Sequence, residues 1–245
     1  MKKYYYDLHV HSCLSPCGDE DNTPNNIAGM AMLCGLNVVA LTDHNSCKNC
    51  PAFFEAAKKH GIISIAGMEL TTSEDIHLVC LFEKLEDAMR FDDYVSNHRI
   101  KLKNKPDIFG RQTVLDEEDK LVCEIDDLLI NASDISIEDS YGLVRSFNGI
   151  CYPAHIDRES NGIISVLGTL PEDNPFDYYE LRDGCRTDEF ASLYGISTDR
   201  FIISSDAHYL TDMRDAEAYF EIDEKCCSDD DIRRCIFEIL RRTHR

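Results

Sequence analysis

The sequence lacks long apolar runs. No stretch approaches the ~18 consecutive apolar residues that a membrane-spanning helix needs. The first residues, MKKYYYDLHVH, contain lysines but neither an apolar stretch nor a small-residue cleavage site, so they do not resemble a secretory signal. We therefore expect a cytoplasmic protein that makes no contact with a membrane.

Basic residues are also scarce. The chain has 25 lysines and arginines against 46 aspartates and glutamates, which gives a formal net charge of −21. Because affinity for a nucleic-acid backbone comes largely from Lys and Arg, extended contact with a nucleic acid is disfavoured. A small phosphorylated substrate remains compatible with this charge, since bound metal ions can make one cleft locally positive. The basic run HRIKLKNK at 98–105 is short, and no sequence feature indicates an oligomeric state.

Apolar residues make up 43% of the 245 residues, enough for the core of one large domain. Up to about residue 90, predicted strands and helices alternate, which favours parallel strands joined by right-handed crossovers. Residues 96–131 interrupt this alternation and are expected to form an insertion containing a hairpin with strands TVL and LVCEI. The expected strands are 4–10, 37–42, 62–66, 77–82, 150–153, 177–181 and 201–204, and later helices are expected at 136–149, with Ser136 as N-cap, and at 229–242.

The chain contains 12 cysteines, which fall into two kinds of context. Several lie in apolar stretches, which predicts small, buried, free thiols: Cys34, Cys80, Cys123 and Cys151. A second set follows the first two predicted strands and includes a zinc-like C-x-x-C spacing: Cys13, Cys17, Cys47 and Cys50. This second set is compatible either with an additional metal site or with free loop cysteines.

Histidines and carboxylates recur where predicted apolar strands end or begin. His9 and His11 are spaced so that both point to the same side of an extended strand. Imidazole and carboxylate are the ligands that suit Zn, Mn and Fe, and strand ends are where an α/β barrel assembles residues distant in sequence. The candidates from this pattern are His9, His11, Asp43, His44, Glu69, His77, His155, Asp206 and His208. The other histidines are expected to be ordinary surface residues: His60, His98 and His244.

The segments that carry these residues are DLHVHSCLSPCGD, ALTDHN, AGMEL, IHLVCLF, YPAHIDR and SSDAHYL, in that order. Over nearly the whole chain they resemble the PHP (polymerase and histidinol phosphatase) superfamily of metal-dependent phosphoesterases, in its stand-alone form. The resemblance implies an α/β fold: a distorted (β/α)7 barrel over residues 1–245, with the small insertion at 96–131. It also implies two to three divalent metal ions (Zn, Mn or Fe) at the carboxyl ends of the strands.

The resemblance further implies three sets of metal ligands. The first set is His9, His11, Glu69 and Asp206. The second shares Glu69 and adds His77 and His155. The third is Asp19, His44 and His208. Some relatives have histidine at the position of Asp19, and the carboxylate there favours Mn or Fe over Zn.

The implied activity is hydrolysis of a phosphoester. A carboxylate bridge such as Glu69 keeps two cations close, and two cations lower the pKa of a bridging water to give hydroxide near neutral pH. Asp19 and His208 are both candidates for protonating the leaving group. Arg158 is a candidate phosphate clamp, with a salt bridge to a nearby acid as the alternative. Asp43 and Glu180 are candidates for hydrogen bonds that orient a ligand imidazole.

Several functions fit these residues. A phosphatase acting on a small phosphorylated metabolite or nucleotide fits the acidic composition best. An exonuclease acting on single-stranded ends would use the same centre, but it is expected to carry basic patches with stacking aromatics. A non-catalytic metal-binding module and a cyclic amidohydrolase are the remaining alternatives. The amidohydrolase class often uses a modified lysine bridge, and we find no lysine at a predicted strand end.

Overall fold

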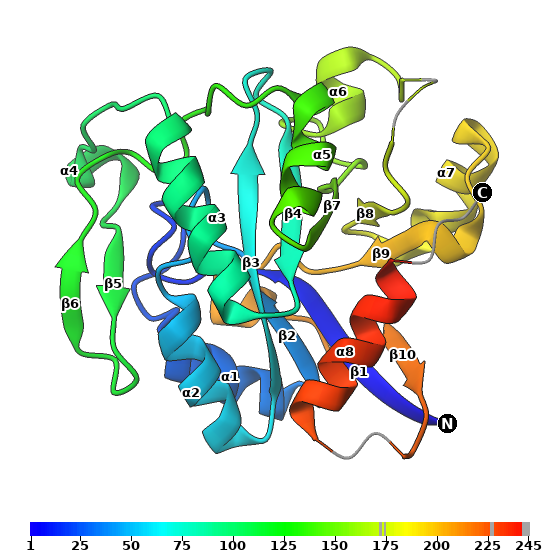
Figure 1. The fold of residues 1–245 in the computed structure, drawn as a ribbon, viewed down its shortest axis with the longest axis horizontal. Coiled ribbons are helices and arrows are strands. Elements are labelled where there is room, and N and C mark those ends of the chain that lie inside the picture. The colour runs from blue at the N-terminus through cyan, green and yellow to red at the C-terminus, as the bar shows by residue number, and fades with distance from the viewer. Residues whose placement is uncertain (172, 174, 226–227, 242–245) are drawn as a thin grey trace.

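The computed structural model describes residues 1–171, 173, 175–225 and 228–241 (Figure 1). His244 and the last residue of the expected C-terminal helix, at 242, lie outside the described residues. Every helix of the described part is too short or too polar to cross a bilayer.

Most strands belong to one curled sheet with the order β10-β1-β2-β3-β4-β7. A parallel pair, β8-β9, and an antiparallel hairpin, β5-β6, form the two other sheets of the described residues. The strands are β1 (Lys2–Val10), β2 (Val38–Leu41), β3 (Ile63–Thr71), β4 (His77–Phe82), β5 (Thr113–Leu115), β6 (Leu121–Glu124), β7 (Gly149–Pro153), β8 (Tyr179–Leu181), β9 (Phe201–Ile203) and β10 (Tyr219–Ile222).

Helices surround this sheet (Figure 1). They are α1 (Pro24–Leu33), α2 (Cys50–His60), α3 (Leu85–His98), α4 (Pro106–Phe109), α5 (Ile137–Ser146), α6 (Ile163–Leu167), α7 (Thr187–Tyr194) and α8 (Asp229–Leu240), with single 3-10 turns at Gly184–Arg186, Thr198–Arg200 and Leu210–Asp212. The predicted N-cap Ser136 is confirmed, because its side chain accepts a hydrogen bond from the Asp139 N–H. The sequence analysis missed α4, α6, α7 and β10, which are short elements between loops.

The β8-β9 pair connects β7 with β1. The segment after β9 pairs with the end of β1 through a parallel bridge between Val10 and Ala207. At the other edge, the Ile156 N–H after β7 donates to the Glu180 carbonyl of β8 at 2.9 Å. The order β1-β2-β3-β4-β7-β8-β9 therefore closes on itself as a distorted seven-stranded barrel.

The expectation that all barrel strands are parallel is wrong at β4. This strand pairs antiparallel with both β3 and β7. The cause is the short connection after β3, where the Thr72 N–H donates to the Ile76 carbonyl at 2.9 Å. A connection of this length can only reverse the chain, since a parallel pair needs a crossover of about a dozen residues or more. As a result, the first residue of β4, His77, pairs with Thr71 at the end of β3.

Strand periodicity divides each barrel strand into an inner and an outer face. On β3, Ile63 and Ile65 pack inside the barrel with apolar residues of α8, and Glu69 belongs to the same face. On β1, Leu8 belongs to this inner cluster but Val10 belongs to the outer one beneath the helices. The register of β1 against β2 shifts between Asp7 and Val10, as at a β-bulge. The interior is thus apolar beside α8 and polar at the opposite end.

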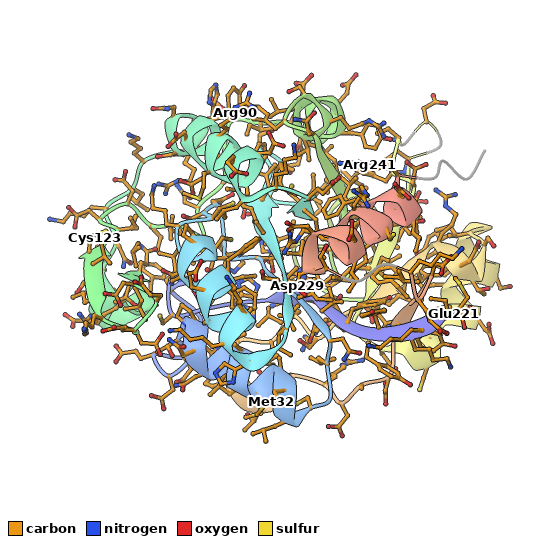
Figure 2. All side chains as sticks on the ribbon, turned by 60° about the horizontal axis from the view of Figure 1, so that its bottom comes forward. Met32, Arg90, Cys123, Glu221, Asp229 and Arg241 are labelled. Carbon is orange, nitrogen blue, oxygen red and sulfur yellow. The ribbon has the colours of Figure 1, made fainter. Side chains whose placement is uncertain are left out.

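Residues 96–131 contain α4 and the predicted hairpin β5-β6, which lies at the edge of the molecule away from α7 and α8 (Figure 1). Figure 2 shows Cys123 of this hairpin at the periphery. Its predicted burial is wrong, because β6 is exposed along its whole length. Cys80 and Cys151, on adjacent barrel strands, are buried as predicted, and Cys34 is half-buried.

Candidate metal centre

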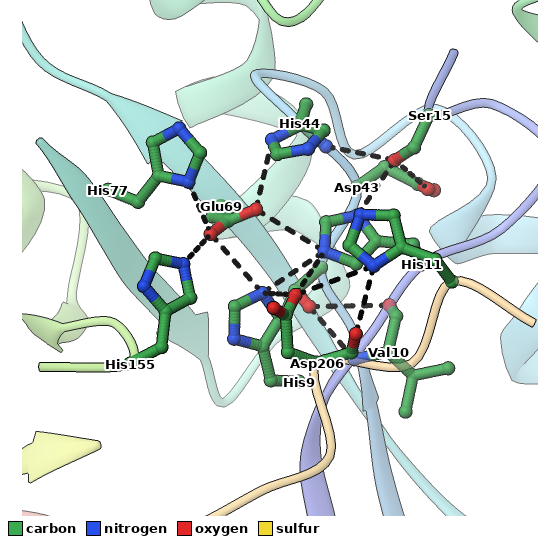
Figure 3. Close-up of polar contacts among 12 residues, drawn as sticks. His9, Val10, His11, Ser15, Asp43, His44, Glu69, His77, His155 and Asp206 are labelled. Carbon is green, nitrogen blue, oxygen red and sulfur yellow. Dashed lines mark hydrogen bonds and ion pairs between the residues drawn. The ribbon is translucent and has the colours of Figure 1, made fainter. Parts of the chain in front are cut away.

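The end of β1 carries two buried imidazoles. The Nε2 atoms of His9 and His11 lie 3.1 Å apart (Figure 3). His9 donates through Nδ1 to Oε1 of Glu180 at 2.9 Å, and this contact turns its Nε2 toward the centre. Glu180, fully buried in an otherwise apolar strand, thereby gains the partner that a buried carboxylate requires.

A hydroxyl and a carboxylate orient His11. Its Nδ1 lies 2.9 Å from Ser15 Oγ, and this hydroxyl donates to Asp43 Oδ1 at 2.7 Å. The Ser12 backbone N–H also donates to Asp43 Oδ1, at 2.7 Å. The carboxylate therefore supports an imidazole through Ser15. Sequence spacing gave no signal for this serine, because its position depends on the loop after β1.

Glu69 lies at the middle of the centre and is fully buried. Its Oε1 is 2.8 Å from His77 Nδ1 and 3.0 Å from His155 Nε2. Its Oε2 is 2.9 Å from His44 Nδ1 and 3.3 Å from His11 Nε2 (Figure 3). The antiparallel strand β4 makes this possible, because it begins with His77 beside the carboxyl end of β3. One carboxylate is therefore surrounded by ligands from four different strands or strand ends.

Asp206 faces the same imidazoles from the loop after β9. Its backbone has a φ of 54°, the left-handed region that L-residues adopt rarely. Its Oδ1 lies 3.5 Å from His9 Nε2 and 3.3 Å from His11 Nε2. Its Oδ2 accepts a hydrogen bond from Arg158 Nη1 at 3.1 Å and lies 3.8 Å from Arg182 Nε. The sequence analysis missed Arg182, although it directly follows the predicted strand 177–181.

The described residues contain three groups of ligand atoms that lie within 4.8 Å of one another. One group is identical to the first set of metal ligands that the family resemblance implies. The two other groups differ from the second and third implied sets. The groups are His9, His11, Glu69 and Asp206; His44, Glu69 and His77; and His11, His44 and His208. His155 lies beside Glu69 but outside these groups, and Asp19 belongs to none of them.

Asp19 and Cys17 differ in how they approach the third group. The Asp19 N–H donates to the His208 carbonyl at 2.9 Å, but its Oδ1 accepts from the Asp21 N–H at 2.8 Å. Cys17, in contrast, lines the same pocket as His44 and His208. Burial alone would raise the pKa of this thiol, but the nearby imidazoles of His44 and His208 lower it to about 5.

The two carboxylates of the centre are held ionised by their neighbours. Burial alone would raise the pKa of Glu69, but the imidazoles of His77 and His44 hold this pKa well below its usual range. Burial also opposes ionisation of Asp206, and the neighbouring His9 imidazole lowers its pKa. The centre therefore presents anionic oxygen ligands to whatever occupies it.

The residues present fit divalent cations. The Nε2 atoms of His9 and His11 lie 3.1 Å apart, a spacing that suits two ligand atoms of one cation. Glu69 Oε2 and Asp206 Oδ1 are buried and make no well-aligned hydrogen bond within the described residues, although imidazole nitrogens lie 2.9–3.5 Å from them. A cation would satisfy such atoms, and imidazole with carboxylate suits Zn, Mn and Fe.

The four loop cysteines do not converge on one point. Cys47 and Cys50 are buried beneath the barrel wall, where both sulfurs contact the Gly67 carbonyl. Cys13 instead contacts the Thr113 carbonyl. No group of metal-ligand atoms in the described part of the chain includes a sulfur. Of the two readings of these thiols, the structure supports free cysteines over one shared metal site.

A pocket of about 530 Å³ opens onto the centre. The part of its wall formed by described residues contains no lysine, which is the bridge that the amidohydrolase alternative would use. Ile130, from the end of the insertion, also lines it. The lining residues are Cys17, His44, Asp75, His77, Ile130, Arg158, Asn161, Arg182, Asp206, His208, Tyr209 and Asp212.

Known proteins match both this sequence and this fold. The PHP domain family matches residues 7–158. A 5'-3' exoribonuclease from Haemophilus influenzae is 38% identical over 88 residues, which cover 34% of this chain and 31% of that protein. The chain spans less than half the length of each of the three curated relatives that it matches.

Two solved structures share the fold. A protein from Bifidobacterium adolescentis, described as a metal-dependent phosphoesterase, superposes with a TM-score of 0.56 and 17% identity, covering 96% of each chain. A lesion-specific endonuclease from Pyrococcus furiosus superposes with a TM-score of 0.57 and 19% identity, covering 85% of this chain and 49% of its own. At these identities the likeness concerns the barrel architecture.

The family match covers more than half of the chain and includes both β1 imidazoles, Glu69 and His155. The chain therefore belongs to the PHP domain family. Its clustered imidazoles and carboxylates are able to bind metal ions.

Proposed function

We propose that the chain is a phosphatase that hydrolyses a small phosphorylated metabolite or nucleotide at a centre of two or three divalent cations. The observation that carries this proposal is the position of two arginines at the pocket. Arg158 and Arg182 both reach Asp206 Oδ2, so they lie directly beside the ligand cluster. Both are partly exposed and both line the pocket, which leaves guanidinium donors available to a phosphate.

Each residue of the centre has a distinct task in this reaction. When bound, the cations supply an activated water and stabilise negative charge on the phosphate oxygens. Glu69 and Asp206 hold these cations, and the hydrogen bond from His9 to Glu180 keeps one imidazole aligned. Arg158 and Arg182 orient the phosphate and add positive charge where the transition state gains negative charge. The pocket, of about 530 Å³, has room for a small substrate.

The leaving group has two candidate neighbours from the sequence, Asp19 and His208. We place His208 beside it, because His208 lines the pocket and Asp19 does not. Asp19 accepts a hydrogen bond from Asp21 within its own loop. This assignment follows from the shape of the pocket and not from the ionisation of either residue.

A second candidate, an exonuclease, is favoured by two observations. The Haemophilus relative is named an exoribonuclease. Tyr209, 53% exposed, lines the pocket, and an exposed aromatic ring is a surface on which a base can stack. The pocket can accommodate the end of a single strand even though the molecule as a whole is acidic.

Phosphate release and strand shortening separate the two candidates. Protein stripped of metal with a chelator and reloaded with Mn(II) or Zn(II) is incubated with p-nitrophenyl phosphate, nucleoside mono- and bisphosphates, and end-labelled single-stranded RNA and DNA. The phosphatase releases inorganic phosphate and leaves oligonucleotides at full length. The exonuclease releases mononucleotides from a labelled end. If metal-replete protein does neither, and the Glu69→Gln variant is indistinguishable from it, the chain is a non-catalytic metal-binding module.

A further inference from the structure

The insertion brings an aliphatic residue to the pocket beside the metal ligands. Most of the pocket wall consists of charged and polar side chains. Among the described residues that line it, Ile130 is the one aliphatic residue, and it is only half-buried. Tyr209, 53% exposed, is the one aromatic residue of the same wall outside the histidines. Neither metal ions nor a phosphate group need an aliphatic neighbour, so Ile130 faces a different part of whatever fills the pocket.

One buried amide holds the backbone on both sides of Ile130. Asn45 is 1% exposed, and its Nδ2 atom donates to the Leu129 carbonyl at 2.7 Å and to the Asn131 carbonyl at 3.0 Å. Its Oδ1 atom accepts from the Thr71 N–H, at the end of β3, at 2.8 Å. The amide therefore uses both its donors and its acceptor to tie the residues that flank Ile130 to the barrel wall.

The neighbouring residue Leu129 is fixed by the insertion itself. It is 1% exposed and packs with Leu14 and Val114 in a small apolar cluster. Its N–H donates to Gln112 Oε1 at 2.7 Å. Packing on one side and the amide of Asn45 on the other hold this turn in place, so the insertion is a scaffold for this part of the pocket wall.

Ile130 and Tyr209 reach the pocket from different parts of the barrel rim. The anchoring contacts place Ile130 over the ends of β2 and β3, whereas Tyr209 follows β9. The arginines that we expect to bind phosphate, Arg158 and Arg182, follow β7 and β8. A substrate whose phosphate lies at these arginines and at the metal centre can therefore extend its organic part along the aliphatic and the aromatic side chain.

We propose that Ile130, positioned by Asn45, is a specificity-determining residue that selects phosphoesters whose organic part has an apolar face, such as an aryl group, over glycerol and sugar phosphates. The inference rests on the proposed function and names the class of substrate that its pocket prefers. An apolar group that covers Ile130 removes apolar surface of both partners from water, which is favourable. A polyol at the same place loses hydrogen bonds to water without replacing them.

Two phosphonates that differ only in their organic part test this preference without turnover. Metal-loaded protein is titrated with phenylphosphonate and with methylphosphonate by calorimetry, and the ratio of the two Kd values is compared among variants. These are Ile130→Ala, Ile130→Leu and Asn45→Gly, with Ile108→Ala as the matched control at a 68% exposed isoleucine of the same insertion. Glycine is used at position 45 because it adopts the φ of 48° found there without strain. Metal analysis and circular dichroism verify that each variant is loaded and folded.

The wild-type protein and Ile108→Ala should prefer phenylphosphonate by the same factor. In Ile130→Ala this preference should fall about five- to tenfold, as expected for the loss of a few apolar carbons from the contact, and Ile130→Leu should restore most of it. Asn45→Gly should lower the preference in the same direction with its metal content intact. If Asn45→Gly keeps the wild-type preference, Asn45 does not position Ile130.

The proposal is overturned if the wild-type protein binds both phosphonates equally or binds neither, or if Ile130→Ala keeps the full preference. Assays of phosphate release from phenyl phosphate separate this result from the proposed function. A preference that depends on Ile130 in a protein that releases no phosphate would contradict the phosphatase and leave the binding preference standing. Phosphate release with a preference that does not depend on Ile130 would do the reverse.

Discussion

Glu69 and Asp206 are two buried carboxylates of one centre, yet their surroundings differ. Glu69 lies within a regular strand and faces imidazoles only. Asp206 lies in a loop with a left-handed backbone, and it faces imidazoles with one oxygen and two arginines with the other. In the proposed centre, Glu69 would therefore serve the metals alone, whereas Asp206 would connect the metals to the residues that we expect to bind phosphate.

This difference has a structural origin. β3 is buried along its whole length and paired on both sides, so Glu69 is held by the sheet itself. Gly67, two residues earlier, contributes to this fit, because a Cβ atom there would lie 2.7 Å from Thr42 Cγ2. Asp206 depends instead on contacts between loops and on its charged partners. Substitutions of Glu69 and of Asp206 should therefore have different effects on metal content and on catalysis.

The largest effect is expected for Glu69→Gln. The amide cannot bridge cations, so metal content should fall at more than one site. The rate constant kcat/KM should drop by roughly 10³-fold or more, a loss of about 4 kcal/mol of transition-state stabilisation. Elemental analysis and phosphate release measure the two losses, with exposed Glu118→Gln as the control. If the Glu69→Gln variant kept its full metal content, Glu69 would not be a bridging ligand.

Asp206→Asn should cost less, roughly 10²-fold in kcat/KM, because Glu69 still holds the shared cations. The amide also loses its ion pairs with Arg158 and Arg182, so KM for the substrate should change along with kcat. Steady-state kinetics across a metal titration measures both effects. A loss that equals or exceeds that of Glu69→Gln would reverse the ranking of the two carboxylates.

Glu180→Gln tests the support of His9 and leaves every ligand in place. The glutamine oxygen can still accept from His9 Nδ1, but the negative charge is lost. Metal affinity should fall by about 10-fold to 100-fold, as is typical when a group that orients a ligand is changed. Competition with a chromophoric chelator measures this affinity, and Glu124→Gln on the exposed hairpin is the control. Unchanged affinity would mean that burial alone positions the imidazole.

Arg182→Met should give the smallest effect. This side chain is 44% exposed and lies 3.8 Å from Asp206, so its charge is partly screened. KM for a phosphorylated substrate should rise about three- to tenfold with little change in kcat, as expected when uniform binding is lost. Arg186→Met, outside the pocket, is the control. A fall in kcat with unchanged KM would assign Arg182 to the transition state instead of to substrate binding.

Much of the centre follows from local sequence. The H-x-H spacing and the carboxylates beside apolar strands predict ligands at one end of a barrel, because strand periodicity is a short-range property. The structure brings together His9, His11, His44, Glu69, His77, His155, Asp206 and His208. It differs at Asp19 because the turns at Ser12 and Ser15 decide which loop side chain reaches the pocket.

The direction of β4 and the role of Arg182 could not be predicted in the same way. Strand periodicity is identical in parallel and antiparallel sheets, so the apolar run 77–82 contained no signal of direction. The direction of β4 could be inferred only from the short length of the turn before it. That length was not known from the sequence, because β3 ends at Thr71 and not at the predicted residue 66. Arg182 is one of many charged loop residues, and its proximity to Asp206 arises from the pairing of β8 with β9.

The reversal of β4 also bears on how the chain assembles during synthesis. Glu69 and His77 share one hairpin and are only eight residues apart, so little chain entropy opposes their meeting. The contact between Asp7 and the Ser205 N–H, next to Asp206, spans 198 residues. Glu69 and His77 therefore emerge from the ribosome almost together, whereas Asp206 and His208 follow more than 100 residues later.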